Sequence, residues 1–407
     1  MNAISIERGT ITSPKGFLAG ATRVGLKTRD GLDLGILYSE SPCVAAGLFT
    51  TNRIKAAPVT LCQRHIADGK AQAIVVNSGC ANACTGERGL EDAAEMANLV
   101  AKRLGIAPQD VLVASTGVIG ERLAIELIAG NIEKVALSKE GGHELAQAIL
   151  TTDTHTKELA VAVSAPILSG PKGGEFIIGG IAKGAGMIHP NLATLLCFIA
   201  TDAAIDARFL EEALREAVDA SFNMITIDGD MSPNDTVLVL ANGLAGNEII
   251  DENNSEAAAF RKTLTEVCTY LAKCIAGDGE GATKLIEVTV DGALSRTDAR
   301  VAARTIAGSP LVKAAVHGCD PNWGRIIAAL GRSGAEVDGS RMDLFLNNIR
   351  LMAGGSPLPF DKGEARAAMM GDEVPIRVCL NLGDSVATAW GCDLAEEYVR
   401  INSEYRT

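Results

Sequence analysis

A small residue followed by threonine stands between a glycine-rich loop and an apolar run in KGAGMIHPNLATLLCFIATDA, residues 183–203. The hydroxyl of Thr194 in this place could attack the carbonyl group of Ala193 before it, which would cut the chain. The freed α-amine, with a pKa of about 8, would then act as the base for the hydroxyl, because threonine alone is a poor nucleophile. The same spacing also fits an ordinary threonine that opens a strand through its β-propensity.

The sequence lacks the other common catalytic signatures. It contains no glycine-rich phosphate loop, dinucleotide-binding fingerprint, lipase nucleophile elbow or HExxH zinc motif. Ten cysteines are spread along the chain without a CxxC pair, and only five histidines accompany them. We therefore expect no metal site, and we expect the cysteines to be small thiols in a reduced core.

The net charge of the chain argues against two classes of binding partner, nucleic acids and anionic membranes. The 407 residues include 37 Lys and Arg against 50 Asp and Glu, a formal net charge of −13. Such a chain lacks the basic surface that nucleic acids and anionic membranes require. The N-terminus has no signal-peptide pattern, and no apolar run reaches the ~18 residues of a membrane span. We expect a cytoplasmic protein without nucleic-acid or membrane partners.

Short β-branched runs alternate with amphipathic helices, and this mixture predicts an α/β or α+β fold around Thr194. Weak domain boundaries are expected near residue 190 and in the Gly/Asp-rich stretch 276–284. Strands are predicted at 73–76, 111–114, 159–163, 175–181, 195–200, 236–240, 286–290, 376–382 and 385–390. Helices are predicted at 90–104, 122–138, 144–150, 207–220 (with Asp206 as its N-cap), 257–276 and 297–306.

Seven further segments accompany the region around Thr194. They are VNSGCANACTG (76–86), ASTGVIG (114–120), ILTTDT (149–154), GDMSPNDTV (229–237), GEGATK (279–284), DPNWGR (320–325) and the C-terminal YVRINSEYRT. Together they resemble the ornithine acetyltransferase family, the arginine-biosynthesis bifunctional proteins with glutamate N-acetyltransferase activity. The matches run in order along essentially the whole chain, so the resemblance is specific. Leu192 and Leu195 stand where methionine is common in the family, a near-isosteric change.

The resemblance implies that the protein cuts itself between Ala193 and Thr194. The domains would then be an N-terminal chain, 1–193, and a C-terminal chain, 194–407. The family's fold implies layered sheets covered by helices, with the chains associated as a heterotetramer of two copies of each. Thr194 would take acetyl from N-α-acetyl-L-ornithine and pass it to L-glutamate in a ping-pong reaction of cyclic arginine biosynthesis. No cofactor is implied, and acetyl-coenzyme A stays open as a second acetyl donor.

Residues far from Thr194 in sequence also acquire roles by the resemblance. The Thr116 hydroxyl and the Gly117 N–H would form the oxyanion hole, although STGVIG by itself also fits an ordinary strand-to-helix turn. Lys183 suits a substrate carboxylate, and Glu280 suits the cationic end of ornithine. The full set of implied substrate-binding residues is Thr151 (or Thr152, if the register differs by one), Lys183, Thr194, Glu280, Asn402 and the terminal Thr407.

Other polar residues receive structural interpretations. His189 is expected to shape the cleavage loop, since the α-amine of Thr194 would be the base. Asp320, Asn322 and Trp323 are expected to form a capped turn where a helix begins. Two other functions stay open: a self-processing amidase or aminopeptidase that releases the acyl group to water, and a non-catalytic small-molecule-binding protein with an uncut chain.

Overall fold

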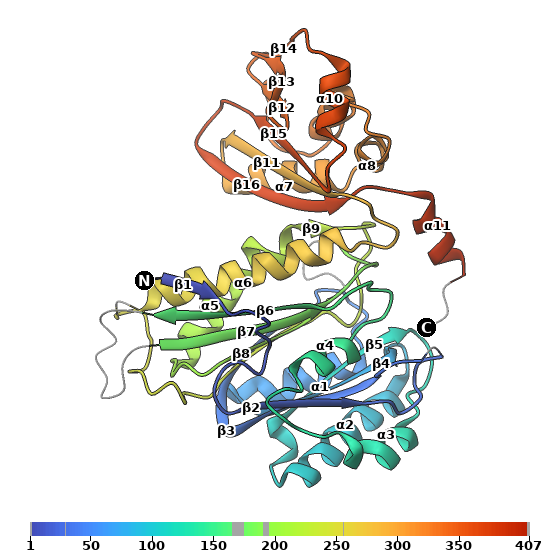
Figure 1. The fold of residues 1–407 in the computed structure, drawn as a ribbon, viewed down its shortest axis with the longest axis vertical. Helices are drawn as coiled ribbons and strands as arrows, with labels where there is room; N and C mark the ends of the chain where they lie inside the picture. The colour runs from blue at the N-terminus through green and yellow to red at the C-terminus, as the bar shows by residue number, and fades with distance from the viewer. Residues whose placement is uncertain (1, 29, 165–174, 190–194, 255, 405–407) are drawn as a thin grey trace.

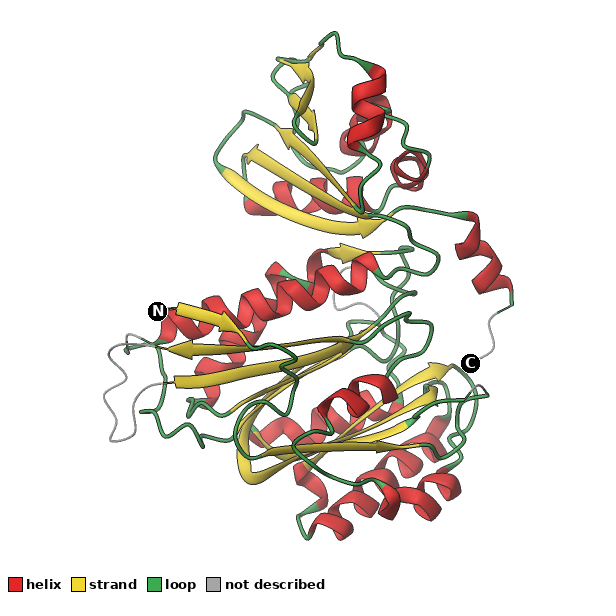
Figure 2. Ribbon diagram, viewed as in Figure 1, coloured by secondary structure: helices red, strands yellow, loops and turns green. Residues whose placement is uncertain are grey.

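Two β-sheets with helices packed against them make up the molecule (Figures 1 and 2). The computed structural model describes residues 2–28, 30–164, 175–189, 195–254 and 256–404. The strands of the first sheet are β1 (Asn2–Ser5), β2 (Phe17–Thr22), β3 (Leu34–Phe49), β4 (Lys70–Cys80), β5 (Val111–Val118), β6 (Lys157–Ser164), β7 (Glu175–Lys183), β8 (Leu196–Thr201) and β10 (Thr236–Ala241). Their order is β1-β6-β7-β8-β10-β3-β4-β5, with β2 paired to β3.

The first sheet forms two layers that share an inner core (Figure 1). Ile181 and Phe198 from the layer of β7 and β8 are in the same buried cluster as Ile74 and Leu112 from β4 and β5. The accompanying helices are α1 (Ala57–His65), α2 (Gly86–Leu104), α3 (Ile125–Asn131), α4 (Gly142–Ala148), α5 (Ala207–Ala220) and α6 (Ala257–Gly277). Helices α5 and α6 pack on the outer side of the β6–β8 layer, and α2 and α3 pack on the outer side of the β3–β5 layer. The predicted layered α/β fold is confirmed.

Strand β8 is apolar from Leu196 to Ala200 because both of its faces are buried. Phe198 faces the inner core, whereas Cys197 and Ile199 belong to the cluster with α5 and α6. A strand with both faces buried needs this continuous apolar pattern. Because β7 pairs antiparallel with β8, the predicted cut between residues 193 and 194 falls in the connection between neighbouring strands of one sheet.

The second sheet contains the remaining described strands, in the order β14-β13-β12-β15-β11-β16-β9. These strands are β9 (Ile225–Thr226), β11 (Leu285–Ala293), β12 (Asp343–Leu346), β13 (Ile349–Ala353), β14 (Ser356–Pro357), β15 (Glu373–Cys379) and β16 (Ser385–Cys392). The helices are α7 (Arg296–Ala307), α8 (Pro310–His317), α9 (Trp323–Gly331), α10 (Lys362–Ala368) and α11 (Glu396–Ser403). Short 3-10 helices are η1 (Ile66–Asp68), η2 (Pro108–Asp110), η3 (Ile132–Lys134) and η4 (Phe222–Met224). Figure 1 shows α11 returning from this sheet toward the first one.

Several predicted elements have different bounds in the structure. Asp206 caps α5 as predicted, because its carboxylate accepts a hydrogen bond from the Phe209 N–H. The helix predicted at 122–138 is wrong in length: α3 and η3 occupy its centre, and Ser138 instead forms a β-bridge with Ala19. Strand β5 runs four residues past its predicted end, so the sequence that could have been a strand-to-helix turn is strand.

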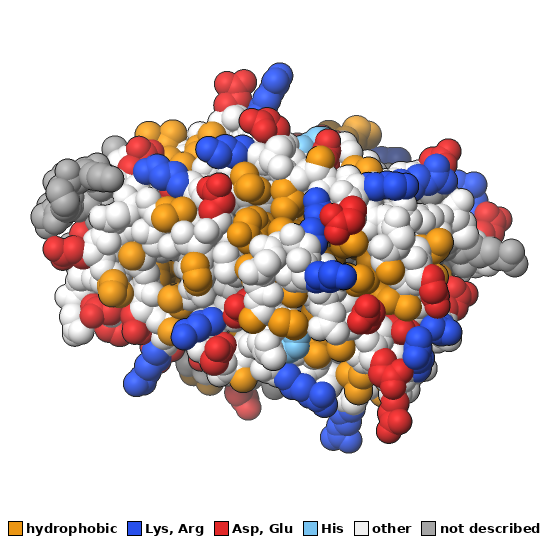
Figure 3. Space-filling model, turned by 90° about the horizontal axis from the view of Figure 1, so that it is seen from below, with side chains coloured by type: hydrophobic (Ala, Val, Ile, Leu, Met, Phe, Trp, Pro, Cys, Tyr) orange, Lys and Arg blue, Asp and Glu red, His pale blue; other side chains and the backbone are white. Residues whose placement is uncertain are grey.

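Two further observations concern the surface charge and the composition of the helices. On the face in Figure 3, Lys and Arg side chains are interspersed with Asp and Glu, without the continuous basic area that nucleic-acid binding requires. Among the described residues, no helix has the length and apolar composition to span a membrane.

Phe198→Ala tests the shared inner core. Phe198 is fully buried, and its truncation should lower the free energy of unfolding by about 3–5 kcal/mol through lost contacts and the resulting cavity. The midpoint of urea unfolding, followed by circular dichroism, measures the effect. Leu311→Ala is the control, because Leu311 is 58% exposed and should cost less than about 0.5 kcal/mol. Equal midpoints for the two variants would contradict this packing.

Candidate active site

One cavity of about 320 Å³ gathers residues from distant parts of the chain. It contains six of the predicted site residues, whereas Ala193, Thr194 and Thr407 lie outside the described residues. Both threonines of the uncertain register, Thr151 and Thr152, line it. The lining residues are Ala81, Thr116, Gly117, Val118, Ile119, Thr151, Thr152, Lys183, Gly186, Met187, Ser232, Asn234, Glu280 and Asn402.

Strand β5 brings Thr116 and Gly117 to one wall of the cavity. Gly117 pairs with Gly79 of β4, at a point where the register of the two parallel strands shifts. Its φ of +134° is unfavourable for other residues, and a Cβ atom at Gly117 would lie 2.3 Å from the carbonyl carbon of Gly79. Only glycine therefore allows strands β4 and β5 to approach this closely beside Thr116.

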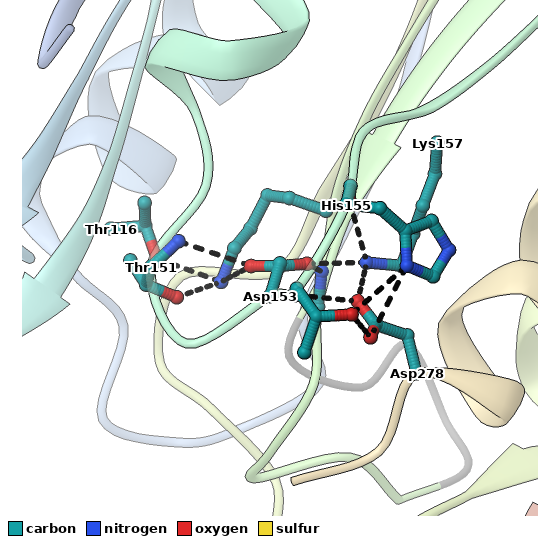
Figure 4. Close-up of polar contacts among 9 residues, drawn as sticks. Thr116, Thr151, Asp153, His155, Lys157 and Asp278 are labelled. Atoms are coloured by element: carbon teal, nitrogen blue, oxygen red, sulfur yellow. Dashed lines mark hydrogen bonds and ion pairs between the residues drawn. The ribbon is translucent and has the colours of Figure 1, made fainter. Parts of the chain in front are cut away.

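Lys183 ends β7 with its side chain buried in the same wall. Its ammonium donates to the Thr151 hydroxyl at 2.7 Å and to the Thr116 hydroxyl at 3.5 Å (Figure 4). Burial lowers the pKa of Lys183, an effect that the nearby Asp153 carboxylate opposes. Thr151 rather than Thr152 is thus the residue that binds this lysine, so the two hydroxyls and the ammonium form one polar group.

A carboxylate behind the cavity carries the opposite charge. Asp153 Oδ2 lies 3.8 Å from Lys183 Nζ, and Asp153 Oδ1 accepts a hydrogen bond from Lys157 Nζ at 2.7 Å. Burial would raise the pKa of Asp153, but the two lysines outweigh burial and hold that pKa well below its usual range. Asp153 is therefore a buried anion that is paired with cations on both sides.

The opposite wall of the cavity is anionic. Glu280 is largely buried, and its Oε2 accepts a hydrogen bond from Asn402 Nδ2 at 2.7 Å. A Cβ atom at Gly186 would lie 2.6 Å from the carboxyl carbon of Glu280, so a larger residue there would displace this carboxylate from its present position. One small cavity thus holds an ammonium on one wall and a carboxylate on another, which suits a ligand with both charges.

Helix α11, which carries Asn402, is bound by an aspartate in addition to its contact with Glu280. The Tyr398 hydroxyl donates to Asp228 Oδ2 at 3.2 Å. The same carboxylate accepts the N–H groups of Met187 and Ile188, at 2.6 and 2.9 Å. Asp228 therefore joins the C-terminal helix to the loop before the predicted cleavage site.

Leu195, which follows Thr194 in sequence, is bound by a buried aspartate. Leu195 is buried, and its N–H donates to Asp235 Oδ1 at 3.0 Å. Burial raises the pKa of Asp235 well above its ordinary value. Asn234 donates to the backbone carbonyl groups of Ala81 and Ser115, at 2.6 and 2.9 Å. The sequence analysis assigned no role to Asp153, Asn234 or Asp235, although all three belong to segments that matched the family.

The remaining predicted residues lie elsewhere. His189 is half-buried, with Nδ1 3.3 Å from the Thr226 hydroxyl, and burial lowers its pKa. Trp323 begins α9 as expected, but Asn322 donates to Asp320 Oδ2 at 3.1 Å and does not cap the helix with its side chain. Among the described residues, no group of three or more His, Cys, Asp and Glu side chains is arranged to hold a metal ion.

Comparison with known proteins identifies the family. The model of the ArgJ family matches residues 18–407. The chain belongs to the ArgJ family. It is 53% identical over 401 residues to the arginine biosynthesis bifunctional protein ArgJ of Dehalococcoides mccartyi, covering 98% of both chains. It is 47% identical over 401 residues to the protein of that name from Bacillus subtilis, covering 98% of this chain and 97% of the relative.

Two solved structures of ArgJ-type proteins also match. The arginine biosynthesis bifunctional protein of Bacillus halodurans is 47% identical with a TM-score of 0.50, and the match covers 51% of this chain and 98% of the solved one. The ornithine acetyltransferase of Mycobacterium tuberculosis, complexed with ornithine, is 35% identical with a TM-score of 0.42, and the match covers 46% and 98%. The predicted family and the prediction of an acyltransferase in arginine biosynthesis are confirmed at the level of ArgJ.

Gly117→Ala tests the close approach of β4 and β5. The added methyl group would collide with the Gly79 backbone, so the Gly117 N–H should move and acetyl transfer should fall at least about 100-fold. Gly120→Ala is a matched control, because Gly120 also has a positive φ, +87°, but nothing lies within 4 Å of the new methyl group. It should keep activity within about threefold and lose only about 1 kcal/mol of stability. Equal initial rates for the two variants would contradict the assignment.

Proposed function

We propose that the chain transfers acetyl from N-α-acetyl-L-ornithine to L-glutamate through an acetyl ester on Thr194. The observation that carries this proposal is the cavity that places Lys183 and Glu280 on different walls, beside Thr116 and Gly117. Membership of the ArgJ family supports it. The substrate carries a carboxylate, an ammonium and an acetyl carbonyl, and each has a complementary group in this cavity.

The charges of the cavity suggest how acetylornithine binds. Its carboxylate would bind the Lys183 ammonium and the Thr151 hydroxyl, which lie 2.7 Å apart. Its side-chain ammonium would bind Glu280, which Asn402 orients. The acetyl oxygen would then face the Thr116 hydroxyl and the Gly117 N–H, the two proposed oxyanion donors. The terminal Thr407 completes the proposed set.

The proposed chemistry splits one amide transfer into two acyl transfers. The Thr194 oxygen attacks the acetyl carbonyl carbon, the C–N bond of acetylornithine breaks, and ornithine leaves with the proton that the hydroxyl gave up. The amino group of glutamate then attacks the acetyl ester and regenerates the threonine hydroxyl. The α-amine of Thr194 would carry the proton in both steps.

Self-cleavage before Thr194 supplies that α-amine in the proposal. The solved Bacillus halodurans chain supports a division near the middle, because 98% of it corresponds to only 51% of this chain. Chains 1–193 and 194–407 would remain associated, since β7 and β8 pair on either side of the cut. We further propose a cytoplasmic heterotetramer of two copies of each chain. Acetyl-coenzyme A stays a proposed second donor, and no cofactor is assigned.

Substitution of the nucleophile tests the cleavage. Thr194→Ala should give an uncut and inactive chain, whereas Thr194→Ser should still cut and keep some turnover, because it retains a hydroxyl. Denaturing gel electrophoresis distinguishes the intact 42.3 kDa chain from two bands of about half that mass. Full acetyl transfer by Thr194→Ala, or an intact chain in active wild-type protein, would refute the assignment.

A transferase and an amidase with the same nucleophile differ in what accepts the acetyl group, which is glutamate in the transferase and water in the amidase. Adding glutamate to the acetyl-enzyme should speed loss of the acetyl group at least about tenfold, because the proposed site binds an amino acid better than it activates water. Rapid-quench sampling with and without glutamate measures this, and leucine serves as the control acceptor. A discharge rate that is independent of glutamate would favour the amidase.

A further inference from the structure

We propose that Lys183, held in place by Asp153, orients the hydroxyls of Thr116 and Thr151 so that both donate hydrogen bonds into the cavity. Asp153, which does not line the cavity, is then a positioning residue for the oxyanion hole. This inference rests on the proposed function and adds to Lys183 a role beyond binding a carboxylate. It is derived from the polar contacts in Figure 4.

The direction of each hydroxyl follows from its contact with Lys183. An ammonium has three donors and no acceptor, and a threonine hydroxyl has one O–H and two lone pairs. Lys183 Nζ contacts Thr151 Oγ1 at 2.7 Å and Thr116 Oγ1 at 3.5 Å, so both oxygens accept. Their own O–H groups must point elsewhere, and both residues line the cavity. Each hydroxyl is therefore free to donate its O–H into the cavity, where two donors would stabilise a developing oxyanion.

The Asp153 carboxylate binds the backbone beside both Thr151 and Lys183. Asp153 Oδ2 accepts the Thr151 N–H at 3.0 Å, and Asp153 Oδ1 accepts the Gly184 N–H at 2.6 Å. Asp153 thereby binds the backbone at Thr151 and next to Lys183, while its charge lies 3.8 Å from the ammonium. The Asp153 side chain is fully buried, and with this many contacts it has no freedom to reorient. Asp153 therefore fixes Thr151 and the end of β7 relative to each other, whereas strand β5 positions Thr116.

Lys157 and Asp278 hold the Asp153 carboxylate away from direct contact with Lys183. Lys157 Nζ lies between Asp153 Oδ1, at 2.7 Å, and Asp278 Oδ2, at 2.5 Å. Asp278 is anchored in turn by the Thr154 N–H at 3.0 Å. The cluster therefore contains two cations, Lys157 and Lys183, and two anions, Asp153 and Asp278. Asp153 lies closer to Lys157 than to Lys183. Lys183 is left with the threonines as its nearest partners.

The two threonine hydroxyls keep this direction only while Lys183 is protonated. A neutral amine has a lone pair that could accept a hydrogen bond from a threonine O–H. The charged groups that face its ammonium are Asp153, Lys157, Glu280 and Asp235. Burial and Lys157 lower the pKa of Lys183, whereas the three carboxylates raise it. Loss of the Asp153 charge must therefore lower that pKa further, and the hydroxyls would lose their direction at a lower pH.

Asp153→Asn tests the inference in the full chain. The alkaline limb of kcat/KM for acetylornithine should move down by about one pH unit or more, because a neighbouring counter-ion typically shifts a pKa by about 1–3 units. Asp202→Asn is the matched control: Asp202 is also a buried carboxylate that accepts two backbone N–H groups, from Lys15 and Ile177. It should leave the alkaline limb in place. A uniform loss of activity in Asp153→Asn at every pH would indicate a merely structural role and overturn the inference.

A second readout keeps this test independent of the proposed reaction. The pH dependence of Lys183 modification by acetic anhydride, read by peptide mass mapping, reports the ammonium directly. Its midpoint should fall by about one unit in Asp153→Asn, and an unchanged midpoint overturns the inference whether or not wild-type protein transfers acetyl. If wild type transfers no acetyl, the proposed function alone fails. Should Asp153→Asn not fold, Asp153→Asn/Lys157→Met removes one charge of each sign. Its midpoint should still fall, but by less, because Asp153 raises the pKa of Lys183 more than Lys157 lowers it; an unchanged or raised midpoint overturns the inference.

Discussion

The buried ammonium of Lys183 is the group on which the rest of the site depends. An unpaired charge in a protein interior costs several kcal/mol, so this ammonium requires the Asp153 carboxylate and two hydroxyl oxygens. Asp153 in turn requires Lys157, and Lys157 requires Asp278. The four charged residues come from the end of β7, the loop before β6, the start of β6 and the end of α6. The folding of the first sheet and the chemistry of the cavity are therefore coupled.

The two sides of the predicted cleavage site both contribute to the cavity. Thr116, Thr151 and Lys183 come from the part before residue 194, whereas Glu280 and Asn402 come from the part after it. The β7–β8 pairing holds the two parts together within one sheet. Under the proposed cleavage, this pairing would keep the residues that line the cavity together in one fold.

Local sequence patterns were sufficient to predict elements that one clear pattern defines, such as the capped helix α5 and the apolar strand β8. They failed where distant segments decide the structure: the β-bridge of Ser138 with Ala19 ends the helical region early, and pairing with β4 extends β5 through Gly117. The family resemblance supplied six of the residues that line the cavity. Asp153 was missed, because its role appears only once Lys157, Lys183 and Asp278 are brought together from separate elements.

The central claim is that Thr194 carries the acetyl group between two substrates. Intact-protein mass spectrometry after incubation with acetylornithine, without glutamate, tests it most directly. The account predicts two polypeptides that correspond to residues 1–193 and 194–407, with the mass of one acetyl group added to the second and located on Thr194 by fragmentation. A single polypeptide in active protein, or an acetyl group on the first polypeptide, would contradict it.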